Sequence, residues 1–200
     1  MMKSTLVLCL AAMALASVGT SQTNPNQTQS MAKNEKYASL FAKFDAAKNS
    51  GKLAEAKAIL ENQIIPEKPG ASGNLLFAAH LCYEMQEYGA ADSYFKRYEK
   101  SYSFDKASPE AIAQNMCFKI LLQSAVSGTA PHWNSLPTKS SVLNPASILE
   151  RECQIATADF YFRTAKVVLS EMKKIGASPE TINILQLRLN QKIQLQKNHP

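Results

Sequence analysis

The residues with the richest chemistry in this sequence are its cysteines, and their spacing limits what they can do. Of the four cysteines, Cys82, Cys117 and Cys153 lie beyond the amino-terminal segment. No two of them have the short separation of a zinc-ligand pair, and no histidine motif completes such a set. All three fall on predicted inward faces of helices. We therefore favour buried free thiols, with a Cys82–Cys117 disulfide, an intermolecular bridge or a reactive thiol as alternatives.

The histidines and the paired carboxylates form no catalytic pattern. His80 lies within a predicted helix, and the other two histidines lie in a loop and next to the end of the chain. None has a cysteine or serine motif beside it that would mark a nucleophile and its base. The pairs Glu84/Glu87 and Glu150/Glu152 occupy positions that helical periodicity predicts to face solvent. The sequence therefore predicts neither an enzyme nor a metal or cofactor site.

The first residues have the pattern of a targeting segment. One positive charge at Lys3 precedes the apolar run Leu6–Ala16, which ends in a small-x-small site. This layout is typical of a secretory signal peptide, and the run is shorter than the ~20 residues of a membrane-spanning helix. We predict a signal peptide over residues 1–16, cleaved between about 16 and 22, and a secreted or periplasmic protein. An uncleaved anchor is the alternative, whereas Cys9 follows a bulky residue and does not fit a lipoprotein signal.

Composition separates a linker from a globular domain. Residues 17–31 are expected to form a flexible linker, because Ser21–Ser30 contains no charge and no strong hydrophobe. Residues 32–200 form the predicted domain of a chain that is 46% apolar and 19% charged, a globular composition. The formal net charge is +6. This modest excess argues against a nucleic-acid-binding face, and we expect no stable membrane insertion after cleavage.

From Ala32 onward the apolar residues recur with the period of an α-helix, and no stretch alternates as a strand does. Stop signals such as Asn49-Ser50-Gly51 and start signals such as Ser108-Pro109-Glu110 divide the chain, and Ser72 is expected to cap the third helix. The sequence predicts an all-α fold of about seven helices in antiparallel pairs. The expected ranges are 32–48, 53–65, 72–86, a helix carrying 91–98, 108–126, 146–175 and 178–196.

Two segments of the chain match at an offset of 35 residues. Leu53–Leu60 aligns with Tyr88–Phe95, and each has a hydrophobe, a small residue three positions on and a large hydrophobe four beyond it. The small residues, Ala56 and Ala91, would let the second helix of each pair lie close to the first. The pattern resembles the tetratricopeptide repeat family, whose units are helix-turn-helix pairs of about 34 residues. The resemblance implies hairpins stacked as a short solenoid, with a nonrepeating helical bundle as the alternative.

The resemblance also implies a division of the domain. Residues 32–105 would form two repeat units, and residues 106–200 would form degenerate carboxy-terminal helices with a long loop at 127–144. This loop carries the sole tryptophan, Trp133. We expect Trp133 to pack against the helices, with a role in interaction as the alternative.

In the repeat family, side chains on the first helix of each unit line a concave groove that holds a peptide. The resemblance places a mixed aromatic and polar set there: Phe41, Asp45, Lys48, Leu76, His80, Tyr83 and Asn115. The set lacks the lysine-and-asparagine arrangement with which the family grips a terminal carboxylate. We expect a non-catalytic, exported adaptor or scaffold that binds a protein or peptide. A small-ligand or lipid-binding helical domain is the first alternative, and a hydrolytic enzyme with an unfamiliar site is the second.

Overall fold

The computed structural model describes residues 25–136 and 144–198, and all regular structure in these ranges is helical. The fold class is therefore all-α, as predicted. One turn of π-helix, Leu60–Ile64, joins α2 to α3, and 3₁₀ turns lie at Phe104–Lys106 and Trp133–Ser135. The α-helices are α1 (Pro25–Asn49), α2 (Leu53–Ile59), α3 (Ile65–Glu67), α4 (Ser72–Glu84), α5 (Tyr88–Ser101), α6 (Pro109–Ser127), α7 (Pro145–Ala158), α8 (Phe162–Lys174) and α9 (Pro179–Asn198).

The chain divides into two compact units, residues 1–35 and 36–200, and the packing described below is that of the second unit. The predicted signal peptide and its cleavage region lie outside the described residues. The predicted linker, 17–31, is described only from Pro25, where α1 begins. Residues 25–31 are therefore helical, which the linker prediction did not expect. Their composition offers little surface to bury, but it contains no helix breaker after the proline, which a first helical turn accepts.

Three helical hairpins, α1/α2, α4/α5 and α7/α8, share one turn geometry. In each turn a residue with positive φ follows the first helix, and the second helix begins two residues later: Gly51 (φ 75°), Gln86 (φ 65°) and Phe160 (φ 64°). The amide that follows this residue donates to a carbonyl five residues earlier in the chain: Lys52 to Ala47 at 2.9 Å, Glu87 to Cys82 at 2.8 Å and Tyr161 to Ala156 at 2.8 Å. These bonds satisfy carbonyls that a helix end otherwise leaves free.

The packing of each hairpin depends on an alanine at the same place in its second helix. Ala56, Ala91 and Ala165 each follow the left-handed residue by five positions, and each is 0% exposed. The absence of a larger side chain lets the two helices approach closely. Four residues further on, a large side chain is buried against the core: Leu60 in the π-helical turn after α2, Phe95 in α5 and Leu169 in α8.

The predicted single helix over 146–175 is wrong, because the chain turns at Asp159–Tyr161 between α7 and α8. No glycine or proline stands there to mark the break. Phe160 takes the left-handed conformation instead, which strains the backbone of a residue other than glycine. Its ring contacts Phe162, with 5.7 Å between ring centroids, and the Lys192 ammonium, 4.3 Å from the ring centroid. Contacts made after folding therefore hold a turn that local sequence did not signal.

Several predicted helix starts are made as expected, and one is not. The Ser108 hydroxyl accepts a hydrogen bond from the Ala111 amide at 3.2 Å, and α6 begins at the following proline. The last helix, α9, likewise begins at Pro179. Ser72 does not cap α4: it is the first helical residue, and Ala71 before it makes no side-chain cap. The α4 amino terminus is instead held by the turn that precedes it, which bonds the Asn74 amide to the Ala71 carbonyl at 3.0 Å.

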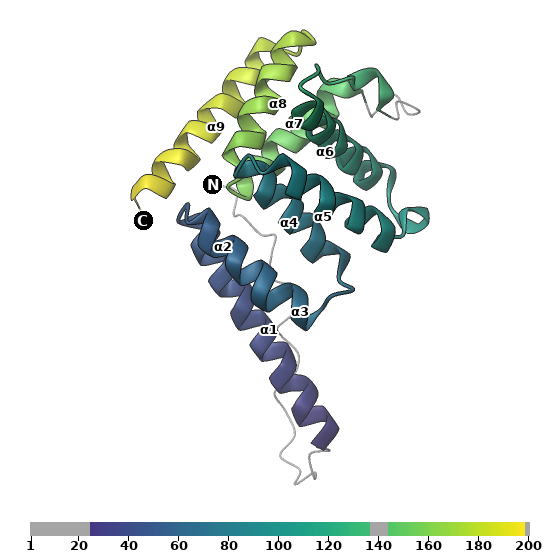
Figure 1. Cartoon of the computed structure of the whole chain (residues 1–200). Helices are drawn as coiled ribbons and strands as arrows, with labels where there is room; N and C mark the ends of the chain where they lie inside the picture. The colour runs from purple at the N-terminus through teal and green to yellow at the C-terminus, as the bar shows by residue number, and fades with distance from the viewer. Residues whose placement is uncertain (1–24, 137–143, 199–200) are drawn as a thin grey trace, which may run out of the picture. The chain divides into compact units, whose positions relative to one another are not determined.

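Helix α4 lies between two clusters of buried side chains. One face of α4, with Ala78 and Leu81, packs with α1 and α2. The other face, with Leu75, Ala79 and Cys82, joins the larger cluster that α5, α6, α7, α8 and α9 complete. Figure 1 shows α4 beside α5 and α7 beside α8, and α4 also contacts α8. Among the helices of the described ranges, none combines the length and the hydropathy needed to cross a membrane.

The cysteines and the tryptophan are buried, as predicted. Cys82, Cys117 and Cys153 are free thiols in the core, and the alternative Cys82–Cys117 disulfide is not formed. Burial raises the pKa of Cys82 and of Cys153 to about 11. Trp133 packs against the helices, and its indole N–H donates to the Glu171 carboxylate at 3.1 Å. Residues 137–143 of the same loop lie outside the described residues.

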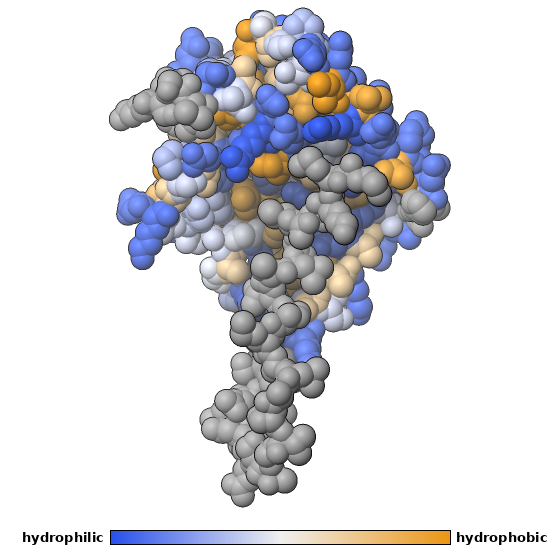
Figure 2. Space-filling view, turned by 180° about the vertical axis from the view of Figure 1, so that it is seen from behind, coloured by the Kyte–Doolittle hydropathy of each residue, from blue (hydrophilic) through white to orange (hydrophobic). Residues whose placement is uncertain are grey.

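The exposed surface carries hydrophobic side chains in separate places. Figure 2 shows one face, on which hydrophobic residues form small patches among hydrophilic ones. Within the described ranges, the large hydrophobic residues that are exposed are Val126, Ile155, Ile175, Ile184, Leu187 and Leu195. Single exposed hydrophobes are normal in soluble domains, so the informative ones are those beside a cleft.

Candidate functional site

Four helices enclose a cleft of about 330 Å³, which we call the α4–α7 cleft. Three of the residues predicted to bind a partner, Leu76, His80 and Asn115, line it together. The full lining is Ser72, Gly73, Leu76 and His80 from α4; Tyr98 and Tyr102 from α5 and its end; Ala111, Gln114, Asn115 and Phe118 from α6; and Glu152 and Ile155 from α7. This cleft is the candidate functional site.

Helical spacing explains why these side chains reach the same cleft. Leu76 and His80 stand four residues apart on α4, as do Gln114 and Phe118 on α6. Side chains three or four residues apart lie on one face of a helix. Each helix therefore presents one stripe to the cleft, and the hairpin packing sets the distance between stripes.

His80 forms an aromatic wall of the cleft. Its ring stacks on Phe118, with 3.7 Å between ring centroids and 28° between planes, and on Tyr161, with 5.2 Å and 16°. Burial, together with the nearby Lys48 ammonium, lowers the pKa of His80 to about 3. The ring is therefore neutral at physiological pH. Its Nδ1 is buried and has no hydrogen-bond partner among the described residues.

Asn115 and two tyrosines form a second, rigid wall. The Tyr98 hydroxyl donates to Asn115 Oδ1 at 2.9 Å, and Asn115 Nδ2 donates to the Ala111 carbonyl at 2.9 Å. Tyr102 stacks on Tyr98 with 5.1 Å between ring centroids. Because both ends of the Asn115 amide are engaged, this residue holds the shape of the cleft rather than offering a free polar group.

The cleft also contains acceptors that the protein leaves unpaired. Glu152 is 4% exposed, its carboxyl group has no hydrogen bond or ion pair among the described residues, and its oxygens open to the cleft. Burial, together with the like charge of Asp159, raises its pKa to about 7. Gln114 Nε2 donates to the Ile148 carbonyl at 3.3 Å, which leaves Gln114 Oε1 buried without a partner among the described residues. Glu152 and Gln114 therefore offer acceptor oxygens to the cleft.

The predicted groove residues of α1 lie elsewhere. Phe41 is half-buried and packs edge-on against Phe77, with 6.1 Å between ring centroids. Asp45 is exposed and forms an ion pair with Lys48 at 3.3 Å. Lys48 is only 5% exposed, and its ammonium lies 5.3 Å from the centroid of the Tyr161 ring. Lys48 is thus a buried structural cation and is not presented to a partner.

Tyr83 is likewise a correction to the predicted groove. It is 3% exposed and packs between Tyr88 and Phe118, with 5.4 Å and 5.7 Å between ring centroids. Burial raises its pKa above the usual range of tyrosine. The error has a physical cause: α4 is covered on both sides, so only the part of its groove face near the amino terminus remains open.

Sequence reasoning missed Glu152, which it expected to face solvent. The signal was present in α7, where Ile148, Leu149, Cys153 and Ala156 form a buried stripe at helical spacing. Glu152 stands four residues after Ile148 and therefore falls within that stripe. Because 146–175 was predicted as one helix, the buried face of α7 was not assigned separately, and Glu152 was placed on the solvent side.

Glu84, also expected to face solvent, ties α4 to α8. Its carboxylate accepts hydrogen bonds from the Arg163 amide, the Thr164 amide and the Thr164 hydroxyl, each at 2.7 Å. Arg163 in turn donates to the Tyr88 hydroxyl at 3.1 Å. A carboxylate at a helix amino terminus satisfies free amides and complements the helix dipole. The contact fixes the α7/α8 hairpin, and Glu152 with it, against the first wall of the cleft.

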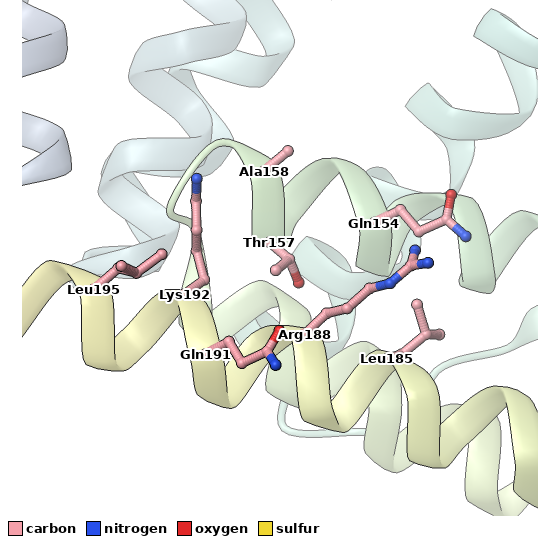
Figure 3. A pocket seen from close by; sticks show the side chains of 8 residues that line it. All are labelled: Gln154, Thr157, Ala158, Leu185, Arg188, Gln191, Lys192 and Leu195. Carbon is pink, nitrogen blue, oxygen red and sulfur yellow. The ribbon is translucent and has the colours of Figure 1, made fainter. Parts of the chain in front are cut away.

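A second cleft, of about 320 Å³, lies on the other side of α7 and is called the α7–α9 cleft. Its cations are Arg188 and Lys192, both from α9. In Figure 3 the Arg188 side chain extends along the cleft toward Gln154, while Lys192 points toward the end of α7. The remaining lining is Thr157, Ala158, Leu185, Gln191 and Leu195. This cleft has the opposite charge to the first.

Metal chemistry finds no support within the described ranges, where no group of three or more His, Cys, Asp or Glu side chains could hold an ion. Comparison of the chain with protein-family models, with curated proteins and with solved structures gave no match. The α4–α7 cleft is therefore interpreted from its own geometry and chemistry.

Proposed function

We propose that this protein is an exported, non-catalytic adaptor or scaffold that binds a protein or peptide in the α4–α7 cleft. The observation that carries the proposal is the meeting of Leu76, His80 and Asn115 in one cleft with the exposed Ile155 at its edge. Recognition sites for peptides combine a few aromatic or aliphatic anchors with polar groups that fix orientation. The walls of this cleft have that mixture.

The repeated hairpins support a tetratricopeptide-like arrangement as part of the proposal. The shared turn geometry and the alanines at Ala56, Ala91 and Ala165 extend the repeat from two hairpins to three. In this arrangement α1, α4 and α7 are the first helices of the three units. Two of them, α4 and α7, line the α4–α7 cleft with α6 between them in sequence. The proposal places peptide binding in this cleft, which contains three of the seven residues that the resemblance implies for the groove.

Export is the second part of the proposal and rests on the amino-terminal pattern of residues 1–16. The cysteines are compatible with it. Thiols react as thiolates, so a buried thiol with a raised pKa is protected from oxidation. The three buried free cysteines of the described residues could therefore persist in an oxidising compartment.

A lipid or small apolar ligand fits the α4–α7 cleft less well. Such ligands favour cavities lined predominantly by hydrophobic side chains. Glu152, Gln114 and Asn115 all line this cleft, and a lipid would leave the first two without polar partners. A peptide can supply donors to these groups through its backbone and side chains.

The test is a selection of peptides from a displayed random library on the purified protein. Peptides that are enriched should bind the Ile155→Lys variant at least about 10-fold more weakly, because the substitution places a long charged side chain at the edge of the cleft. Val126→Lys is the matched control, since Val126 is also exposed on a helix but does not line the cleft. The Val126→Lys variant should bind the enriched peptides with the same affinity as the wild type.

Two results would contradict the proposal. One is the failure of the selection to enrich any peptide. The other is equal binding by the Ile155→Lys and Val126→Lys variants. Stabilisation of the protein by fatty acids in thermal unfolding, together with either result, would favour the small-ligand alternative.

A further inference from the structure

The Glu152 carboxyl group is an unusual feature of the α4–α7 cleft. It is the only residue in the lining that can carry a formal charge at physiological pH, because His80 is neutral there. A buried carboxylate is normally paired with a cation or held by several hydrogen bonds, since burial without partners is costly. Within the described residues Glu152 has neither, and it opens on a cleft large enough to admit a side chain.

The surroundings of Glu152 do not supply the missing cation. Asp159, at the end of the same helix, bears a charge of the same sign. Cys117 from α6 and Cys153 from α7 are thiols whose pKa values burial raises, so they are neutral. His80 from α4 is neutral as well. With a pKa of about 7, the Glu152 carboxyl group is ionised in a large share of the molecules at physiological pH, and none of the other described residues that line the cleft carries an opposite charge.

The rest of the lining suits a long basic side chain. Leu76 and Ile155 offer apolar surface for an aliphatic stem, along which lysine and arginine commonly pack. Tyr102 offers an aromatic ring that attracts a cation. Gln114 Oε1, which lacks a partner among the described residues, adds a second acceptor to the same lining.

We propose that the α4–α7 cleft binds a basic side chain of an extended peptide, with the Glu152 carboxylate as its counter-ion. This inference rests on the proposed function and names the chemistry of its ligand. The acidic group of this cleft is opposite in charge to the lysine of a groove that binds a terminal carboxylate through lysine and asparagine. A partner would therefore present a lysine or arginine within a largely extended segment.

The experiment uses the peptides enriched on the wild-type protein. A basic residue should recur at one aligned position, above its frequency in the starting library. The best lysine peptide is then compared with its norleucine counterpart, which keeps the aliphatic stem and lacks the ammonium. The wild type should prefer the lysine peptide by at least about 30-fold, because loss of one partner of a buried charge pair is costly.

Glu152→Gln should reduce this preference to a few-fold at most, because it removes the charge and keeps the shape. Glu150→Gln is the matched control: it makes the same change two residues away on α7, at a carboxylate that accepts a surface hydrogen bond from Gln154 and does not line the cleft. The Glu150→Gln variant should prefer the lysine peptide over the norleucine peptide as strongly as the wild type does. Thermal unfolding of both variants confirms that each is folded.

The inference is overturned if the enriched peptides lack a basic position, or if Glu152→Gln reduces the lysine preference no more than Glu150→Gln does. In that case, peptides that still depend on Ile155 would leave the proposed function intact. If no peptide is enriched at all, the proposed function fails and this inference fails with it.

Discussion

The two clefts on either side of α7 are similar in size and opposite in charge. The α4–α7 cleft, of about 330 Å³, contains the Glu152 carboxyl group, and the α7–α9 cleft, of about 320 Å³, contains the cations Arg188 and Lys192. Both receive side chains from α7, which presents Glu152 and Ile155 to one and Gln154 and Thr157 to the other. One helix therefore separates two regions of different electrostatic character.

The difference lies in how each charge is solvated. Arg188 is exposed, and Lys192 lies over the Phe160 ring, so neither cation depends on a ligand. Glu152 is buried and has no partner among the described residues. A charge that water already solvates gives little energy to binding, whereas an uncompensated buried charge gains strongly from a counter-ion. This contrast is why we assign ligand binding to the α4–α7 cleft.

The largest expected effect is that of Glu84→Ala, which removes the link between α4 and α8. The variant should lose about 3 kcal/mol of unfolding free energy, because three hydrogen bonds to a largely buried carboxylate disappear and two helix amides lose their acceptor. The effect should be local to the α4–α7 cleft, since α7, α8 and α9 keep their mutual packing. Urea unfolding measures the stability, and amide chemical shifts show which cleft changes.

Glu87→Ala is the control for this prediction. Glu87 is paired with Lys57 near the surface, where an ion pair contributes less than about 1 kcal/mol. If Glu84→Ala costs no more than this control, or if the shifts spread equally to both clefts, Glu84 does not anchor the α7/α8 hairpin against α4.

An effect of similar size is expected from the charge of Glu152 itself. Its folded-state pKa, about 7, lies above its ordinary value of 4.5, so the folded protein binds more protons than the unfolded chain between these pH values. Wild-type stability should therefore fall as pH rises through this window. Glu152→Gln should be about 3 kcal/mol more stable than the wild type at pH 8, and the difference should vanish below pH 4.5.

Arg188→Gln is the counterpart in the α7–α9 cleft. It should change stability by less than about 0.5 kcal/mol at either pH, because the side chain is exposed. Denaturant unfolding of both variants at pH 4.5 and pH 8 measures the comparison. A pH-independent effect of Glu152→Gln, or an equal effect of Arg188→Gln, would remove the proposed distinction between the clefts.

The smallest expected effect concerns His80, whose folded-state pKa of about 3 lies below its ordinary value of 6.5. Between these pH values the unfolded chain binds the proton and the folded protein does not, so stability falls as pH decreases. At pH 5.5 this costs about 1 kcal/mol relative to pH 8. His80→Phe, which keeps an aromatic ring beside Phe118 and Tyr161, should lack this contribution. The test is the pH dependence of the unfolding free energy, measured for the wild type and for His80→Phe. Equal slopes would show that folding does not change the pKa of His80.

Prediction from the sequence succeeded where neighbouring residues set the structure. The Ser108-Pro109-Glu110 start and the Gly51 stop lie where they were expected, because caps and left-handed glycines act within a few residues. The buried positions Ala56 and Ala91 followed from a repeat that helical periodicity makes visible. The site was predicted in part: Leu76, His80 and Asn115 meet in the cleft, and Tyr83 and Lys48 do not.

Prediction failed where distant segments decided the outcome. The turn at Phe160 has no local breaker, and the Phe160 ring contacts the Lys192 ammonium, which comes from α9, a distant segment. Glu84 was expected to face solvent because nothing near it in sequence reveals that α8 will place two free amides beside it. The same holds for Glu152, whose neighbours in the cleft come from α4, α5 and α6.

The sequence alone determined the helical class, most of the helix ends and the small residues that let hairpins close, because hydrophobic periodicity and capping operate over one or two turns. Only the tertiary structure decided which carboxylate caps a helix and which is buried without a partner, because burial depends on the segments that pack around a residue. The charge of the candidate site therefore belongs to the fold, although every residue that forms it is visible in the sequence.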